Sequence, residues 1–217
     1  MNRSDILAKV SDYVARAISR LDRVRYHSET GYVDAFLGRL DGTIYLGEEK
    51  GLIDLKATIA TDRGPNSAEK RYGADFALVF NSSNNTLPLK KAILGQAKNG
   101  TVERLNSQEL SRLVKQCSDM AKVTHHYVVL EAPLRNGKIP TIRLGTYQNN
   151  RWSEQEIQFD VYLVDKIISC EHGDRRASFI EQVGDSKLTT LKVLTYGLDY
   201  EPDPSSSLDN DDISPSP

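Results

Sequence analysis

Three polar side chains stand at the ends of two short apolar segments, and their types suit metal-assisted cleavage of a phosphodiester bond. Asp75 opens the segment 74–80, and Gln96 and Lys98 close the segment 91–98. Side chains alternate between the faces of a strand, so Gln96 and Lys98 share one face. We expect Asp75 to be the anionic ligand of a divalent cation and Gln96 to offer a neutral amide oxygen. Lys98 would orient the attacking water or neutralise charge on the phosphate.

The pattern of Asp75 with Gln96-Ala97-Lys98 resembles the PD-(D/E)xK nuclease superfamily. The Gln-x-Lys form is similar to the Mrr-like branch, in which Gln replaces the usual acidic residue. The resemblance covers roughly residues 25–130. It implies a restriction-endonuclease-like fold, Mg²⁺ or Mn²⁺ as cofactor, DNA as substrate and the backbone carbonyl of Ala97 as a further metal ligand. It also implies a role in restriction or anti-phage defence, where members commonly form homo-oligomers or act with a partner protein.

A second carboxylate would complete such a site, and Glu29 is the first candidate. It begins a predicted helix and continues that helix's apolar face, so its carboxylate points towards the protein. A carboxylate in that position needs a partner, and a metal is one. The alternative is that Glu29 only interacts with the positive end of the helix dipole. Glu69 is a rival ligand, and Glu48 and Glu49 have less in their favour.

Apolar periodicity predicts the elements that must position these residues. Helices are expected over residues 4–24, 28–40 and 107–121, and strands over 74–80, 91–98, 127–130 and 139–144, with one or two more within 43–60. Segments 74–80 and 91–98 should form a hairpin, and a helical crossover should make 127–130 parallel to 91–98. Residues 159–170 fit a helix or a strand, and 176–198 stay open. The prediction is one α/β domain over residues 1–200, with a central mixed sheet of about four or five strands flanked by helices.

The charge of the chain is unevenly distributed. The net charge of the 217 residues is −2, but six of the 30 acidic residues and none of the 28 basic ones lie after position 198. The body is therefore mildly basic, which is compatible with phosphate binding. Residues 201–217 are mostly Pro, Ser and Asp, and this composition predicts a disordered acidic tail. Without a secretory signal or a membrane-spanning run, we expect a cytoplasmic protein.

Other motifs support chemistry less well. His125 and His126 are adjacent and would point to opposite faces of a strand, and Cys170-Glu171-His172 lacks a second pair for zinc. Cys117 and Cys170 are expected to be thiols rather than a bridge. Two alternatives to the nuclease stay open. One is the same fold without catalysis, binding nucleic acid or a partner protein, and the other is an unrelated α/β interaction domain that works through the acidic tail.

Overall fold

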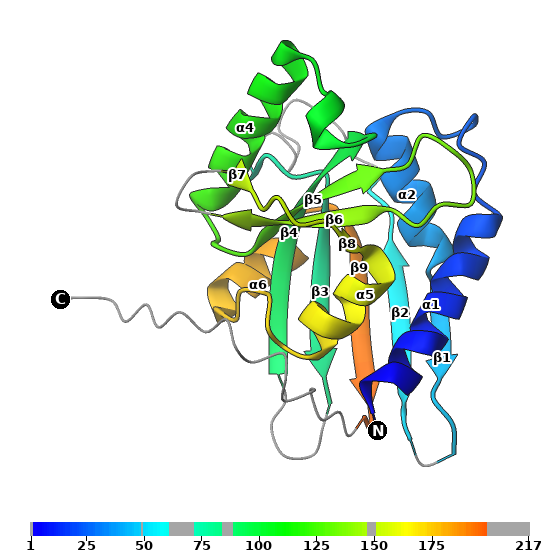
Figure 1. The fold of residues 1–217 in the computed structure, drawn as a ribbon. Coiled ribbons are helices and arrows are strands. Elements are labelled where there is room, and N and C mark those ends of the chain that lie inside the picture. The colour runs from blue at the N-terminus through cyan, green and yellow to red at the C-terminus, as the bar shows by residue number, and fades with distance from the viewer. Residues whose placement is uncertain (1, 49, 61–71, 84–88, 147–150, 199–217) are drawn as a thin grey trace.

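A wide mixed β-sheet runs through the part of the chain that this computed structural model describes, residues 2–48, 50–60, 72–83, 89–146 and 151–198 (Figure 1). Nine strands within those residues belong to the sheet: β1 (Gly42–Tyr45), β2 (Leu52–Thr58), β3 (Phe76–Ser82), β4 (Leu89–Asn99), β5 (Tyr127–Ala132), β6 (Thr141–Thr146), β7 (Arg151–Trp152), β8 (Ile157–Gln158) and β9 (Thr189–Tyr196). The predicted α/β class with a mixed sheet is confirmed, and the predicted number of strands is too low. The predicted tail, residues 201–217, lies outside the described residues.

The strands follow the order β1-β2-β9-β3-β4-β5-β6-β7, and β8 pairs with β6. Strands β3 and β4 are antiparallel, with Phe76 opposite Gly95, as predicted. Strands β4 and β5 are parallel, with Gln96 opposite Val129, and helix α4 (Ser107–Ala121) connects them, again as predicted. Strand β9 lies between β2 and β3, antiparallel to the first and parallel to the second. The C-terminal part of the described chain therefore completes the middle of the sheet.

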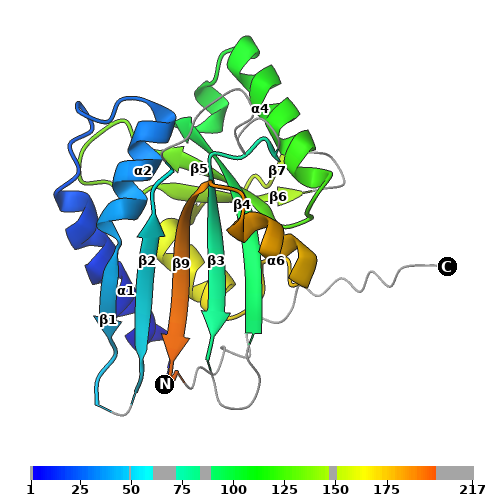
Figure 2. The same cartoon turned by 180° about the vertical axis from the view of Figure 1, so that it is seen from behind.

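Helices cover both faces of the sheet (Figures 1 and 2). They are α1 (Arg3–Ser19), α2 (Glu29–Arg39), the 3₁₀ turn η1 (Val102–Arg104), α4, α5 (Phe159–Tyr162) with its π-helical continuation η2 (Leu163–Ile168), and α6 (Ala177–Gly184). Helices α1, α2 and α5 share one apolar core, in which Phe36 meets Phe159 edge-to-face at 4.9 Å. Helices α4 and α6 share the core on the other face, which contains Leu113 and Tyr127.

Helix α1 ends earlier than the sequence pattern predicts. It stops at Ser19 instead of residue 24, and Asn2 caps its start. Leu21 is buried, but Val24 is 83% exposed, so the apolar spacing beyond residue 19 is not a helical face. Residues 20–27 form a loop, and this loop reaches the end of β4. Helix α4 begins with a capping box made by Asn106 and Glu109.

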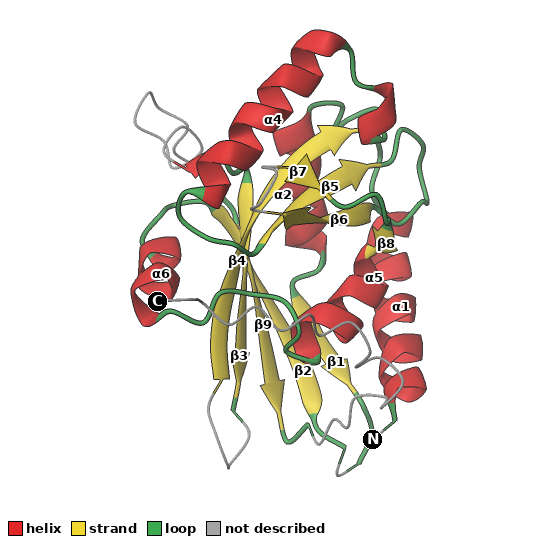
Figure 3. Cartoon of the chain, turned by 60° about the vertical axis from the view of Figure 1, so that its left-hand side comes forward, coloured by secondary structure: helices red, strands yellow, loops and turns green. Residues whose placement is uncertain are grey.

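Strand β4 passes through two differently oriented parts of the sheet. Figure 3 shows β5, β6 and β7 at a marked angle to β1, β2, β9 and β3, with β4 continuing through both. Strand β3 begins at Phe76, opposite Gly95, so the last residues of β4 extend beyond it. That extension carries Gln96, Ala97 and Lys98. The backbone on the β3 side of this extension must therefore find partners other than a neighbouring strand.

Two further predictions concern cysteines and membranes. Cys117 and Cys170 are both free thiols, as expected, and Cys117 is buried. Among the described residues, no helix combines the length and the apolar character that a membrane crossing needs.

Candidate active site

Asp75 lies immediately before β3, beside the part of β4 that extends past it. Its backbone N–H donates to the carbonyl of Gly95 at 2.8 Å, which continues the β3–β4 ladder by one residue. Its Oδ2 accepts from the backbone N–H of Ala97 at 2.9 Å and from the side-chain amide of Gln96. Asp75 thus replaces the missing strand partner, and the structure brings Asp75 and Gln96 together as the sequence predicted.

The side chain of Gln96 is almost completely buried, at 1% exposure. Its Nε2 donates to Asp75 Oδ2 and approaches the carbonyl oxygen of Ala97 at 3.3 Å. Its Oε1 is buried without a hydrogen-bond partner among the described residues. A buried acceptor left in that state costs about 1–3 kcal/mol, so a donor or a cation there would be stabilising.

The carbonyl of Ala97 faces the same side as Asp75. The N–H and C=O of one residue in a strand point to the same neighbour, and the N–H of Ala97 points to Asp75. A carboxylate and a backbone carbonyl therefore meet at the end of β4, and the amide of Gln96 turns its nitrogen towards both of them. This donor set is the kind that Mg²⁺ and Mn²⁺ prefer, since both are hard cations that take oxygen ligands. Asp75 and the carbonyl of Ala97 fit the predicted metal as they stand, and Gln96 would add an oxygen ligand once its amide turns to exchange Nε2 for Oε1.

The fold places the side chain of Lys98 next to that of Glu29. Its Nζ lies 2.9 Å from Glu29 Oε2, and the Lys98 side chain is only 4% exposed while that of Glu29 is 30% exposed. The other oxygen of Glu29 accepts from the backbone N–H of Asn99 at 3.4 Å. Ser28 caps α2 and so fixes Glu29 in the first turn of the helix. Glu29 does have an inward partner, as predicted, and that partner is Lys98.

Of the other acidic candidates, only Glu48 belongs to the described residues, and it has no contact with this group. Glu48 is exposed in the turn between β1 and β2, and Glu49 and Glu69 fall outside the described residues. Cys117 is close enough to Lys98 to be affected by its charge, but burial raises the pKa of the thiol to about 12 against that opposing effect. The thiol is therefore protonated at neutral pH and is no nucleophile.

Sequence reasoning missed Arg23, which ties the site to two surface loops. Its guanidinium donates to the carbonyl of Pro133 at 2.8 Å and to the side chain of Asn99, and its backbone N–H donates to Asn136 at 2.8 Å. It also lies 4.7 Å above the ring of Tyr32. The prediction of a helix through residue 24 hid this role. The sequence does contain a sign of the loop: residues 20–25 include three arginines and few apolar residues, which does not suit the end of a buried helix.

The two loops that Arg23 joins are basic and carry exposed apolar side chains. Arg20 and Arg25 are exposed in the first loop, and Arg135 and Lys138 in the second. Val24 and Leu134 are 83% and 61% exposed. Because Arg23 contacts Asn99, the residue after Lys98, this basic surface borders the site. Such a surface suits a polyanion.

Three glutamates lie close enough together to hold a metal, but an arginine already stands among them. Glu103, Glu131 and Glu156 are the group. The buried guanidinium of Arg143 contacts all three, at 2.6, 2.9 and 2.6 Å respectively. Glu131 also accepts from the backbone N–H of Val102 at 2.8 Å. We interpret this cluster as a structural one. Glu131 lies opposite Lys98 in the sheet and holds the backbone of Val102, so the cluster fixes the chain where it leaves β4.

A scan against protein-family models and searches of curated proteins and of solved structures returned no match for this chain. The case for a function therefore rests on the geometry at the end of β4.

Proposed function

We propose that this chain is a divalent-metal-dependent endonuclease that hydrolyses phosphodiester bonds of DNA, with a site of the PD-(D/E)xK type and a restriction-endonuclease-like core. The observation that carries the proposal is the buried Oε1 of Gln96. It has no hydrogen-bond partner among the described residues, and it belongs to the amide whose nitrogen, Nε2, contacts Asp75 Oδ2 and the carbonyl of Ala97. The basic loops next to the site support a nucleic acid as the substrate.

Each residue has a distinct part in this proposal. Asp75, Gln96 and Ala97 would hold the cation, which lowers the pKa of bound water and offsets charge on the phosphate. Lys98 is buried and aligned by Glu29, so its ammonium is held ready to balance charge that develops on the phosphate. Glu29 as a direct metal ligand stays a prediction. Cleavage in restriction or anti-phage defence, by a cytoplasmic homo-oligomer or with a partner protein, is the setting that the resemblance suggests.

A second candidate function is a nuclease-fold module that binds nucleic acid or a partner protein without cutting it. The observation in its favour is charge. Gln96 is neutral, and Glu29 already forms an ion pair with Lys98, so the cation would face fewer uncompensated negative charges than a site with two carboxylates. The two candidates share the fold and the basic surface and differ in metal binding.

Plasmid cleavage with Mg²⁺, Mn²⁺ or EDTA tests the first candidate. Wild type should cut with either metal and not with EDTA, and Asp75→Asn should lose cleavage by about 10²-fold or more together with Mn²⁺ binding in calorimetry. Asp12→Asn, at an exposed residue on α1, is the matched control and should behave as wild type. Gln96→Glu should tighten Mn²⁺ binding because it adds a charge.

The outcomes separate the candidates. An Asp75→Asn variant that cuts as wild type does would rule out this site. Wild-type protein that binds DNA but cuts with neither metal, and binds no Mn²⁺, would favour the binding module.

A further inference from the structure

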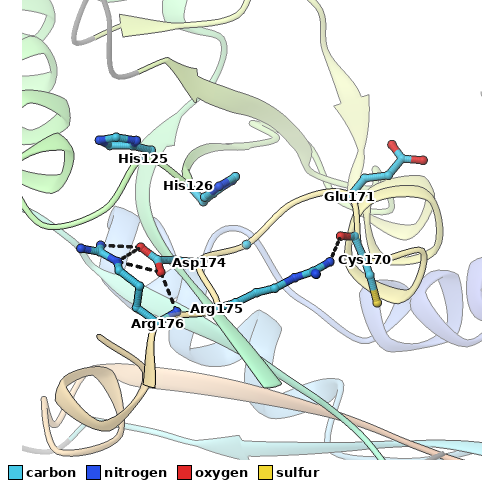
Figure 4. Close-up of a pocket in the computed structure, with 8 residues that line it drawn as sticks. His125, His126, Cys170, Glu171, Asp174, Arg175 and Arg176 are labelled. Carbon is cyan, nitrogen blue, oxygen red and sulfur yellow. Dashed lines mark hydrogen bonds and ion pairs between the residues drawn. The ribbon is translucent and has the colours of Figure 1, made fainter. Parts of the chain in front are cut away.

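A pocket of about 550 Å³ lies near the other end of β4 (Figure 4). His125 and His126, just before β5, form one wall. The segment from Cys170 to Arg176, between η2 and α6, forms the other. The volume is in the range of roughly 300–1,000 Å³ that is usual for small-molecule sites. The pocket is separate from Asp75 and Gln96, which lie at the opposite end of the strand.

The wall formed by residues 170–176 is fixed by hydrogen bonds before any ligand arrives. Asp174 exchanges two backbone hydrogen bonds with Ala92 of β4, each at 3.0 Å, and its side chain accepts from Thr124 at 3.0 Å. His172 is buried beneath the segment, where its Nδ1 lies 2.9 Å from the hydroxyl of Tyr162. A pocket with preformed walls loses little conformational entropy on binding.

Both carboxylates of the pocket are already neutralised. Asp174 pairs with Arg176 at 2.5 Å, and Glu171 pairs with Lys166 at 2.5 Å. Figure 4 shows Arg176 folded onto Asp174, whereas Arg175 extends across the pocket towards Cys170. These pairs leave the remaining cations to set the charge of the pocket.

Two positive charges near the pocket have no carboxylate partner among the described residues. Arg175 donates only to the backbone carbonyl of Cys170, at 3.0 Å, and is exposed. Lys91 is completely buried against Gly173, and its Nζ donates to the carbonyl of Lys166 at 3.1 Å. Burial lowers the pKa of Lys91 to about 8, so it is still mostly charged at neutral pH. Arg175 therefore brings one uncompensated positive charge into the lining of the pocket, and Lys91 adds a second behind that lining, against Gly173.

His126 provides a flat, neutral surface beside these charges. Its ring meets that of His172 edge-to-face at 5.0 Å. Burial keeps the pKa of His126 below its usual value; the charge of Asp174 opposes this effect, and His125, Lys91 and Arg175 add to it. At neutral pH the ring is therefore an uncharged donor and acceptor with an apolar face.

We infer that this pocket binds a small phosphate-bearing molecule of mononucleotide type, with its phosphate on Arg175 and its remaining part along His126. A phosphate monoester carries about −1.5 to −2 charges at pH 7, which matches the excess positive charge. The planar guanidinium of Arg175 suits two phosphate oxygens at once. The same phosphate could belong to a free nucleotide or to the 5′ end of a nucleic-acid strand. The inference is independent of the proposed nuclease activity.

Calorimetry of the full chain in EDTA tests the inference with matched probes. AMP and inorganic phosphate should bind, and adenosine, which lacks the phosphate, should not. Arg175→Ala should weaken AMP binding by about tenfold or more, because a hydrogen bond to a charged group contributes about 1.5–3 kcal/mol. Arg112→Ala, at an exposed arginine on α4 away from the pocket, should leave AMP binding unchanged.

A pair of short single strands, with and without a 5′-phosphate, identifies the source of the phosphate. Preference for the phosphorylated strand over its twin, lost in Arg175→Ala, assigns the pocket to strand ends, and binding of AMP without that preference assigns it to free nucleotides. Equal binding of AMP and adenosine, unchanged AMP binding in Arg175→Ala, or no saturable binding of any probe would each overturn the inference.

Discussion

Strand β4 carries a buried lysine near each end, and the two lysines have opposite environments. Lys91 is fully buried and Lys98 is 3% exposed. Lys98 pairs with Glu29 at 2.9 Å. Lys91 has one hydrogen bond to a backbone carbonyl and lies 5.3 Å from the centre of the Phe80 ring. Burial is nearly the same in both places, but among the described residues only Lys98 has a carboxylate in an ion pair with its ammonium.

The difference shows that burial alone does not assign a role to a charged group. Removing a charge from water is expensive, and a partner recovers part of that free energy. At Lys98 the partner comes from the chain and also sets the direction of the side chain, which suits a group that acts on a substrate. At Lys91 no carboxylate of the described residues does this, and burial lowers the pKa to about 8. One lysine is held in position, and the other leaves a positive charge uncompensated.

The largest expected effect is on cleavage. Lys98→Met removes the buried ammonium from the candidate site, so plasmid cleavage should fall by about 10²-fold or more while Mn²⁺ binding stays within a few-fold. Lys91→Met makes the same chemical change at the other end of β4 and should leave cleavage within about threefold. Circular dichroism verifies that both variants fold. Equal losses in the two variants would mean that Lys98 has no special part in the reaction.

The second effect is a gain in stability, which we expect when the other buried lysine, Lys91, is replaced. Lys91→Met should raise the free energy of unfolding at pH 7 by roughly 3 kcal/mol, because the pKa of Lys91 is lowered from 10.5 to about 8. Below pH 8 the lysine is charged in both the folded and the unfolded state, so the variant keeps its full advantage.

Above pH 8 the folded state of wild type releases a proton that the unfolded state still holds. Wild-type stability therefore rises relative to Lys91→Met between pH 8 and 10.5, and the advantage of the variant disappears. Urea unfolding of both proteins across pH 7–11 measures this. A constant difference over that range would show that Lys91 does not titrate as described.

The smallest effect concerns the ion pair itself. Glu29→Gln keeps the shape and an acceptor for Lys98 but removes the negative charge, and it should lower stability by about 1 kcal/mol, since the carboxylate is 30% exposed. Glu181→Gln, at an exposed residue of α6, should change stability by less than about 0.5 kcal/mol. A double-mutant cycle with Lys98→Met should give a coupling of about 1 kcal/mol. Additive effects would mean that Glu29 acts only on the helix dipole.

Local pattern predicted much of the sheet around the candidate site. Segments 74–80, 91–98 and 127–130 are strands with the expected directions, and Asp75 and Gln96 meet, because alternation and a single crossover determine those relations. Strand β9 was not predicted, since its place depends on pairing with β2 and β3, which are distant in sequence. The two-residue strands β7 and β8 are too short to leave an alternating pattern.

Some residues around the two sites were predicted from the sequence, and others were missed. Glu29 was expected to point inward, but only the fold shows that it meets Lys98. Arg23 was missed because the loop that holds it reads as the end of a helix. His125-His126 and Cys170-Glu171 were each judged poor sites on their own. The pairing of Ala92 with Asp174 brings them to one pocket, and a sequence pattern does not contain such a long-range contact.

The position of β9 has a consequence for synthesis of the chain. Ribosomes release β2 and β3 well before β9. In the sheet these two strands do not pair with each other, because β9 lies between them and joins them. Until β9 emerges, one edge of β2 and one edge of β3 have no strand to pair with. Strand β3 also carries the apolar side chains of Leu78 and Phe80, which are buried in the complete fold. Unpaired apolar edges promote association between chains. The two halves of this sheet join only after residues 189–196 have emerged, so folding must be completed late and depends on what protects those edges in the meantime.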